Sequence, residues 1–266
     1  MATMTELNRK STPSVKDPAP IATGLHGHMM GVESLRSVAV EFLGTFVLVL
    51  TIIATAIAAQ LAKPVAGVPY GSLAIPLAGG FALVVVVASF GHLSGAHFNP
   101  AVTVGLTLNR RFPIRMVLPY ALAQLAGAIV AALSAWVLFG DRARSVASLG
   151  ATAPAPGVGV GRVFAAEGIV TFVLVLVVLS VATEARVPQG LAAIAIGLAL
   201  AAAIFISGPI SGGGVNPARA LGPMIVAGKF TDWWVYVIAP LVGGAFAATI
   251  FHQFLYTPAT TEPPGR

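Results

Sequence analysis

Cysteine and charge are both scarce in this sequence, and each scarcity excludes a class of protein. None of the 266 residues is cysteine, so disulfide frameworks and thiolate metal sites are excluded. Only 9% of the residues are charged, whereas 57% are hydrophobic. So few charges cannot cover a globular surface in water, and the composition therefore predicts a protein embedded in a lipid bilayer.

The basic excess gives no sign of a nucleic-acid partner. The formal net charge is +6, but the basic residues are scattered through connecting segments without an interleaved aromatic patch. The stretch from Met1 to Glu33 is polar and lacks the apolar core of a secretory signal peptide. We expect residues 1–35 and 257–266 to be tails, the first of them disordered.

Groups for catalysis are missing as well. Ser94 and Ser211 have no histidine and acid at a spacing that indicates a nucleophile. No cluster of His, Asp and Glu indicates a metal site. The sequence therefore predicts neither an enzyme nor a bound cofactor or metal.

Long apolar runs are abundant. Six of them are about 20 residues long, the length that crosses roughly 30 Å of hydrocarbon as a helix. Two more are too short to span, and each begins at a proline. The six expected spans cover roughly 36–59, 71–90, 114–139, 162–183, 189–206 and 233–256, and the short runs cover 100–108 and 217–226.

The chain repeats itself. Glu41 to Leu50 matches Glu167 to Leu176, and Tyr120 to Gly127 echoes Tyr236 to Gly243, in the same order and at similar spacing. This pattern indicates a tandem duplication, with repeat one at about 36–139, a linker at 140–161 and repeat two at about 162–256. Three spans in each repeat is an odd number, so the second repeat enters the bilayer from the opposite face.

The topology follows from the cations. They favour the loops on the side of the two termini, most clearly at Arg110, Arg111 and Arg115. By the positive-inside rule we expect both tails to be cytoplasmic, on either side of a membrane domain that covers 36–256. The abundance of Ala, Gly and Pro is typical of a bacterium with a GC-rich genome, so we expect the protein in a bacterial inner membrane.

Each short run starts with the same triplet, Asn99-Pro100-Ala101 in one repeat and Asn216-Pro217-Ala218 in the other. Asn is a preferred N-cap, and Pro suits the first helical position because its missing N–H has no partner there in any case. Two half-helices that enter from opposite faces should meet at the midplane. Because non-helical backbone is tolerated at that depth only inside protein or beside water, a watery path should pass them.

The two helix starts carry the positive ends of their dipoles, so the meeting point repels cations and hydronium. Each Asn side chain caps the backbone with its oxygen and keeps its amide N–H groups for a passing oxygen. Arg219 adds a permanent charge beside the second half-helix, either as a pore-lining donor or as a structural partner of loop carbonyls. These features favour neutral permeants that form hydrogen bonds.

Two acids lie inside predicted spans, where acids are rare. Glu41 and Glu167 occupy equivalent places in the repeats, and they either relay protons or hold the loops before the half-helices. His92 and His97 flank the first loop, as packed or solvated histidines, with a pH gate at His92 as the other interpretation.

These motifs resemble those of the aquaporin, or major intrinsic protein, family. The resemblance rests on His97-Phe98-Asn99-Pro100-Ala101-Val102-Thr103, on Asn216-Pro217-Ala218-Arg219 and on the repeated Glu-x-x-x-Thr-Phe. It implies an all-α membrane protein with six transmembrane helices and two re-entrant half-helices in inverted repeats. It also implies one pore in each subunit of a homotetramer, and loop-supporting roles for Glu41 and Glu167.

The resemblance also locates a selectivity filter. Counted from the motifs, its four positions are Gly79, Ile204, Gly213 and Arg219, with Gly80 as the fallback for the first. Water-selective members are similar to one another in having an aromatic residue and a His at the first two positions. This chain has neither, so we expect a wider and partly apolar opening.

The filter residues resemble those of nodulin-like intrinsic proteins and their bacterial relatives, whereas glycerol facilitators have Asp in place of Ala220. This resemblance implies a passive channel for glycerol, urea or boric, silicic or arsenous acid, together with water, that excludes ions and protons. A water-selective aquaporin is the alternative. An ion-coupled secondary transporter and an intramembrane hydrolase are more distant ones.

Overall fold

The structure is a computed structural model that describes residues 35–61, 70–183 and 187–256. Within these residues six helices are long and apolar enough to cross a membrane, which confirms the six predicted spans. The tails at 1–34 and 257–266 lie outside the described residues. The long helices are α1 (Leu35–Leu61), α2 (Tyr70–Ser94), α4 (Val117–Phe139), α6 (Val160–Ala182), α7 (Gln189–Ser211) and α9 (Val235–Ile250).

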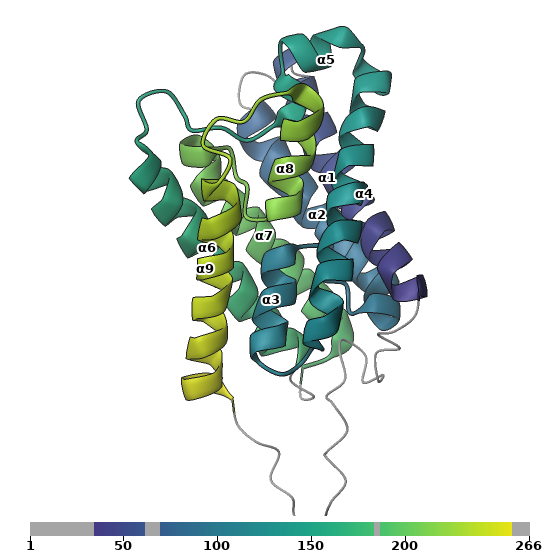
Figure 1. Ribbon diagram of the computed structural model, residues 1–266, viewed down its shortest axis with the longest axis vertical. Coiled ribbons are helices and arrows are strands. Elements are labelled where there is room, and N and C mark those ends of the chain that lie inside the picture. Colours follow the sequence, from purple (N-terminus) through teal and green to yellow (C-terminus); the bar gives the residue numbers. More distant parts are fainter. Residues whose placement is uncertain (1–34, 62–69, 184–186, 257–266) are drawn as a thin grey trace, which may run out of the picture.

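Two short helices lie between the long ones. They are α3 (Pro100–Leu108) and α8 (Pro217–Ala227), and at 1.5 Å per residue each is about half the length that crosses the hydrocarbon. Figure 1 shows them one above the other in the middle of the bundle. The start of α1 and the end of α9 lie at the same end of the molecule, as an even number of spans requires.

Each half-helix packs mainly against a long helix of the other repeat. Within each repeat the first and third long helices pair, α1 with α4 and α6 with α9. However, α3 packs mainly on α9, and α8 packs mainly on α4. A Cβ on Gly222 of α8 would lie only 2.5 Å from the Cβ of Ala128 on α4. The two repeats therefore pack into one interlocked bundle rather than two adjacent ones.

The repeats also meet where α2 crosses α7. A Cβ on Gly80 would lie 2.8 Å from the Cβ of Ala201 and 2.9 Å from the carbonyl oxygen of Gly197. A Cβ on Gly197 would in turn lie 2.6 Å from the carbonyl oxygen of Gly80. Because both glycines lack a side chain, the two backbones approach closely at this crossing.

Some boundaries differ from the predicted ones. Helix α2 continues past Phe90 to Ser94, and α7 continues past Ile206 to Ser211. The glycines and the proline in these last turns suggest an earlier end, but Pro209 in the last turn of α7 does not end the helix there. Instead each helix ends where its serine hydroxyl bonds a buried glutamate.

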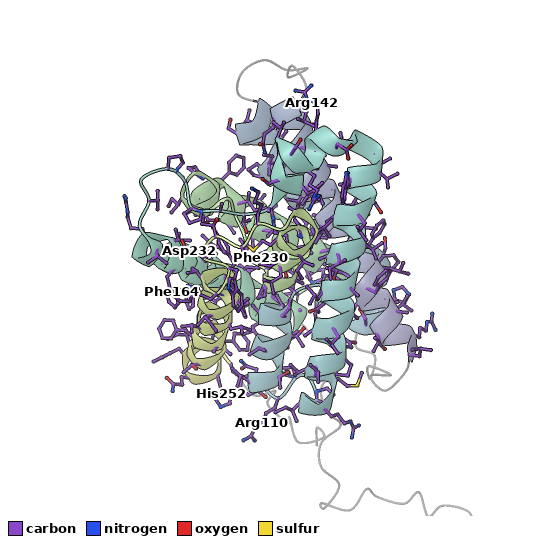
Figure 2. The ribbon with its side chains drawn as sticks, turned by 45° about the horizontal axis from the view of Figure 1, so that its top comes forward. Arg110, Arg142, Phe164, Phe230, Asp232 and His252 are labelled. Carbon is purple, nitrogen blue, oxygen red and sulfur yellow. The ribbon has the colours of Figure 1, made fainter. Side chains whose placement is uncertain are left out.

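The expected linker at 140–161 is partly ordered into helix. It contains α5 (Asp141–Ser145) and a 3₁₀ turn at Ser148–Gly150, and Leu149 in this turn is completely buried. Another 3₁₀ turn, Ile114–Met116, precedes α4, and a π-helical turn, Phe251–Leu255, follows α9. Figure 2 shows Arg110 and His252 at one end of the bundle and Arg142 at the other.

Candidate functional site

The two Asn-Pro-Ala triplets begin the half-helices and face each other. The side-chain oxygen of Asn99 accepts from the backbone N–H of Ala101 at 2.9 Å. That of Asn216 accepts from Ala218 at 3.0 Å and from Arg219 at 3.2 Å. Both Asn residues are extended N-caps, each followed by a proline at the first helical position. The local sequence thus sets both helix starts.

The side-chain amides also join the two repeats. Asn99 donates from its Nδ2 to the carbonyl oxygen of Val215 at 3.1 Å, and Asn216 donates to that of Phe98 at 2.8 Å. A primary amide has two N–H bonds, so each Asn keeps one for another acceptor. From the sequence we expected both N–H bonds of each amide to be available to a permeant, but one of the two is already used.

The carbonyls that accept these bonds come from unusual backbone. Phe98 and Val215, each just before an Asn, have positive φ angles of 49° and 57°. Such a conformation costs a residue with a side chain on the order of 1 kcal/mol or more, and it persists where the surroundings fix it. Here the surroundings are the glutamates and the opposite Asn.

The two buried glutamates hold these loops by the same pattern of bonds. Glu41 accepts from the backbone N–H groups of His97 at 3.0 Å and Phe98 at 2.7 Å. Glu167 accepts from those of Gly214 at 2.9 Å and Val215 at 2.6 Å. Their oxygens are thus occupied by loop donors, as a loop-supporting role requires and a proton relay does not.

Repeat one has further polar groups that repeat two lacks. Gln124 donates to Glu41 at 2.8 Å and to the hydroxyl of Thr103 at 3.2 Å, and Thr103 lies 3.1 Å from Nδ1 of His97. By sequence register the equivalents of Gln124, Thr103 and His97 in repeat two are a proline, an alanine and a glycine, namely Pro240, Ala220 and Gly214. The side chains that surround the two loops before the half-helices are therefore chemically different.

A cavity runs past both Asn residues. Arg111 and Thr183 line it at one end, and Ile204 and Arg219 line it at the other, with Asn99 and Asn216 also on its wall. Polar groups come from the two loops and from the half-helix starts. The rest of the wall is aliphatic and comes from α1, α2, α3, α6 and α7, through residues such as Leu48, Ile52, Leu83, Val102, Leu174, Val178, Ile196 and Leu200.

The structure brings three of the four filter positions into contact. A Cβ on Gly79 would lie 2.8 Å from Cδ1 of Ile204, and a Cβ on Gly213 would lie 3.1 Å from its Cγ2. The Ile204 side chain therefore fills the space beside Gly79, which is not among the residues that line the cavity. The fallback residue, Gly80, instead faces Gly197 of α7.

Arg219 reaches the same end of the cavity. Its side chain is buried, and Nη1 donates to the carbonyl oxygen of Gly150 at 3.2 Å. Its Nε has no hydrogen-bond partner among the described residues. Arg219 thus combines the two roles left open by the sequence, because it bonds a loop carbonyl and also lines the cavity.

Several contributors were not found from the sequence. Gly150 lies in the segment taken as a linker, and the equivalent of Gln124 in repeat two is a proline, so no repeated pattern identified either. Arg111 lines the other end of the cavity, with its guanidinium 5.3 Å from the ring centroid of Tyr256. His97 is buried, and His92 is exposed on α2.

Comparison with known proteins identifies the family to which this site belongs. The family model described as major intrinsic protein matches residues 28–251. The chain belongs to the major intrinsic protein family. As in other family members, the site serves a multi-pass membrane channel for water or small solutes, and the family consists of channels rather than enzymes.

Individual members of the family support this assignment. Aquaporin AqpM of Methanothermobacter thermautotrophicus is 42% identical over 191 residues, which is 69% of this chain and 76% of that protein. Aquaporin NIP3-1 of Oryza sativa subsp. japonica is 35% identical over 257 residues, which is 91% of this chain and 79% of that protein.

The fold agrees with that of a solved member of the major intrinsic protein family. The X-ray structure of the aquaglyceroporin from Plasmodium falciparum matches with a TM-score of 0.73 and 26% identity, over 83% of this chain and 96% of that one. The likeness extends over nearly all of that structure, so the bundle with its two half-helices is shared.

Proposed function

We propose that this protein is a passive channel for small uncharged solutes and water that excludes ions and protons. The solutes would be glycerol, urea or a metalloid hydroxide such as boric, silicic or arsenous acid. The observation that supports this best is the layer around Arg219, where Gly79, Ile204 and Gly213 provide neither a ring nor an imidazole.

The chemistry of the cavity wall fits such solutes. A buried donor without an acceptor costs about 1–3 kcal/mol, which a hydroxyl or carbonyl of a permeant can recover. Arg219 Nε and one N–H on each of Asn99 and Asn216 are such donors. The aliphatic wall opposite them receives carbon–hydrogen groups without desolvation cost. A cation meets the charge of Arg219 and two positive helix ends.

The filter is open on one side only. Ile204 fills the space beside Gly79 on one side, and on the other side the missing side chain of Gly213 leaves the face of Ile204 uncovered and adds width. The names of relatives point the same way, because they include an aquaglyceroporin and proteins of the NIP type.

Stopped-flow light scattering on reconstituted protein tests the proposal with gradients of glycerol, urea and boric acid, and with an impermeant osmolyte for water. We expect fast re-swelling with at least one of the three solutes. Rapid water flux with all three excluded would instead establish a water-selective aquaporin. Uphill flux driven by an ion gradient would establish a secondary transporter.

We further propose a homotetramer in a bacterial inner membrane, with residues 36–256 as the channel domain and both tails, 1–35 and 257–266, in the cytoplasm. The described helix ends lie on one side of the bundle (Figure 1), which supports tails on a common side. Light scattering of the detergent complex measures the subunit number. Protease digestion of inside-out and right-side-out vesicles tests the location of the tails.

A further inference from the structure

Helix α1 forms one wall of the filter, although none of the four filter positions lies on this helix. Ile52, in the middle of α1, is only 2% exposed and lines the cavity together with Ile204. A Cβ on Gly79 would lie 3.3 Å from Cγ1 and 3.4 Å from Cδ1 of Ile52. Ile52 and Ile204 therefore both pack into the space where a side chain on Gly79 would lie.

The next residue of α1 supports another side of the same layer. A Cβ on Gly150 would lie 2.9 Å from Cβ and 3.0 Å from Cα of Ile53, which is completely buried. The carbonyl oxygen of Gly150 accepts from Arg219. Because successive helical residues point about 100° apart, α1 touches the aliphatic side of the filter with Ile52 and supports the arginine side with Ile53.

We propose that Ile52 is a specificity-determining residue, which sets the width of the filter together with Gly79 and Ile204. A β-branched side chain in a helix has one strongly preferred χ1 rotamer, so Ile52 is a fixed wall rather than a side chain that moves aside. The size of the residue at this position then limits the cross-section of the solute. This inference rests on the proposed function, in which that layer selects the solute.

The repeat provides a matched control. Val178 occupies in repeat two the place that Ile52 occupies in repeat one, because each lies eleven residues after the glutamate of its repeat, Glu167 or Glu41. Val178 also lines the cavity, but it lies on α6, whereas the contacts around Gly79 come from Ile52 and Ile204. A general effect of wall volume would appear at both positions, and a filter effect at Ile52 alone.

The test measures glycerol, erythritol and water fluxes of Ile52→Ala, Ile52→Phe and the matched Val178→Ala and Val178→Phe in proteoliposomes. We expect Ile52→Ala to raise the erythritol-to-glycerol flux ratio several-fold and Ile52→Phe to lower the glycerol-to-water ratio several-fold. The Val178 variants should change both ratios much less. Unchanged ratios in both Ile52 variants, or equal shifts in the Val178 variants, overturn the inference.

A double variant guards against a folding defect. Gly79→Ala places a Cβ against Ile204 and Ile52, and Ile52→Ala removes part of that contact, so the pair should restore glycerol flux toward wild type. Glycerol flux no higher in the pair than in Gly79→Ala alone contradicts the inference. If the wild type passes water but no solute, the proposed function has failed. Ile52→Ala should then admit glycerol, and its failure to do so overturns the inference as well.

Discussion

At the scale of single residues, Arg219 is the clearest candidate for charge exclusion. It is a buried guanidinium whose Nη1 bonds a loop carbonyl and whose Nε faces no acceptor among the described residues. A fixed positive charge in a narrow, low-dielectric passage raises the energy of any cation there. The bond to Gly150 fixes where that charge sits.

Replacing this charge tests its role. We expect Arg219→Val to increase proton or sodium leak in proteoliposomes while solute flux remains, since the side chain shrinks and the charge disappears. The measurement is the decay of an imposed pH gradient, followed with an entrapped dye. Arg162→Val, at an exposed arginine on α6, is the control. A leak equal to wild type in Arg219→Val leaves this arginine with a structural role only.

Gly79 makes a second prediction at this scale. A phenylalanine there has to displace Ile204, whose Cδ1 lies 2.8 Å from the required Cβ position. The ring and the displaced Ile204 side chain narrow the opening, and a permeation barrier raised by about 1.4 kcal/mol would lower glycerol flux about tenfold in Gly79→Phe.

Water flux in Gly79→Phe should fall less, because water needs a smaller opening. Stopped-flow scattering gives both rates from one preparation. The control is Gly161→Ala, since a Cβ on Gly161 meets nothing within 4 Å. Equal losses of water and glycerol flux would show that this position does not discriminate by size.

At the scale of elements, the two repeats use different pairs of residues where the first long helix packs against the loop before the half-helix. The ring of Phe98 occupies the place of a Cβ on Gly44. The equivalent pair in repeat two consists of two valines, Val170 and Val215. In repeat one the glycine and the phenylalanine together fill the space between the first long helix and the loop before the half-helix, and in repeat two the valines hold the equivalent positions.

This compensation predicts strong coupling between the two positions. Gly44→Val alone should destabilise the protein by about 3 kcal/mol through overpacking, and Phe98→Val alone by a similar amount through the cavity left behind. The double variant copies the solution of repeat two and should recover much of that loss. Thermal unfolding in detergent measures all three, and additive losses would contradict the compensation.

At the scale of the whole molecule, the crossing of α2 and α7 holds the repeats together. Gly197 packs on backbone of α2, including the carbonyl oxygen of Gly80, which cannot move aside as a flexible side chain can. Gly197→Val should therefore lower the unfolding temperature markedly. Gly208→Ala on the same helix should change it little, because a Cβ there meets nothing within 4 Å. Similar unfolding temperatures for the two variants would show that the crossing tolerates bulk.

The global architecture was predictable because it depends on patterns that repeat along the chain. Span length, the duplicated Glu-x-x-x-Thr-Phe and the paired triplets predicted six spans and two half-helices. Local compensation was not predictable in this way. The filling of the Gly79 space by Ile204 depends on side chains from different helices. Gly150 accepts the hydrogen bond of Arg219 with its carbonyl oxygen. Every residue has such an oxygen, so the residue type at position 150 could not predict the bond.

The reciprocal bonds between the triplets have a consequence for half of the molecule on its own. Asn99 donates to a carbonyl of repeat two, Asn216 donates to one of repeat one, and each half-helix packs mainly on the last long helix of the other repeat. A single repeat cut from the chain thus lacks the acceptor for its Asn and the main packing surface for its half-helix. Each half therefore completes the fold of the other, and we expect separately synthesised halves to assemble only with each other, as complementary fragments of one membrane domain.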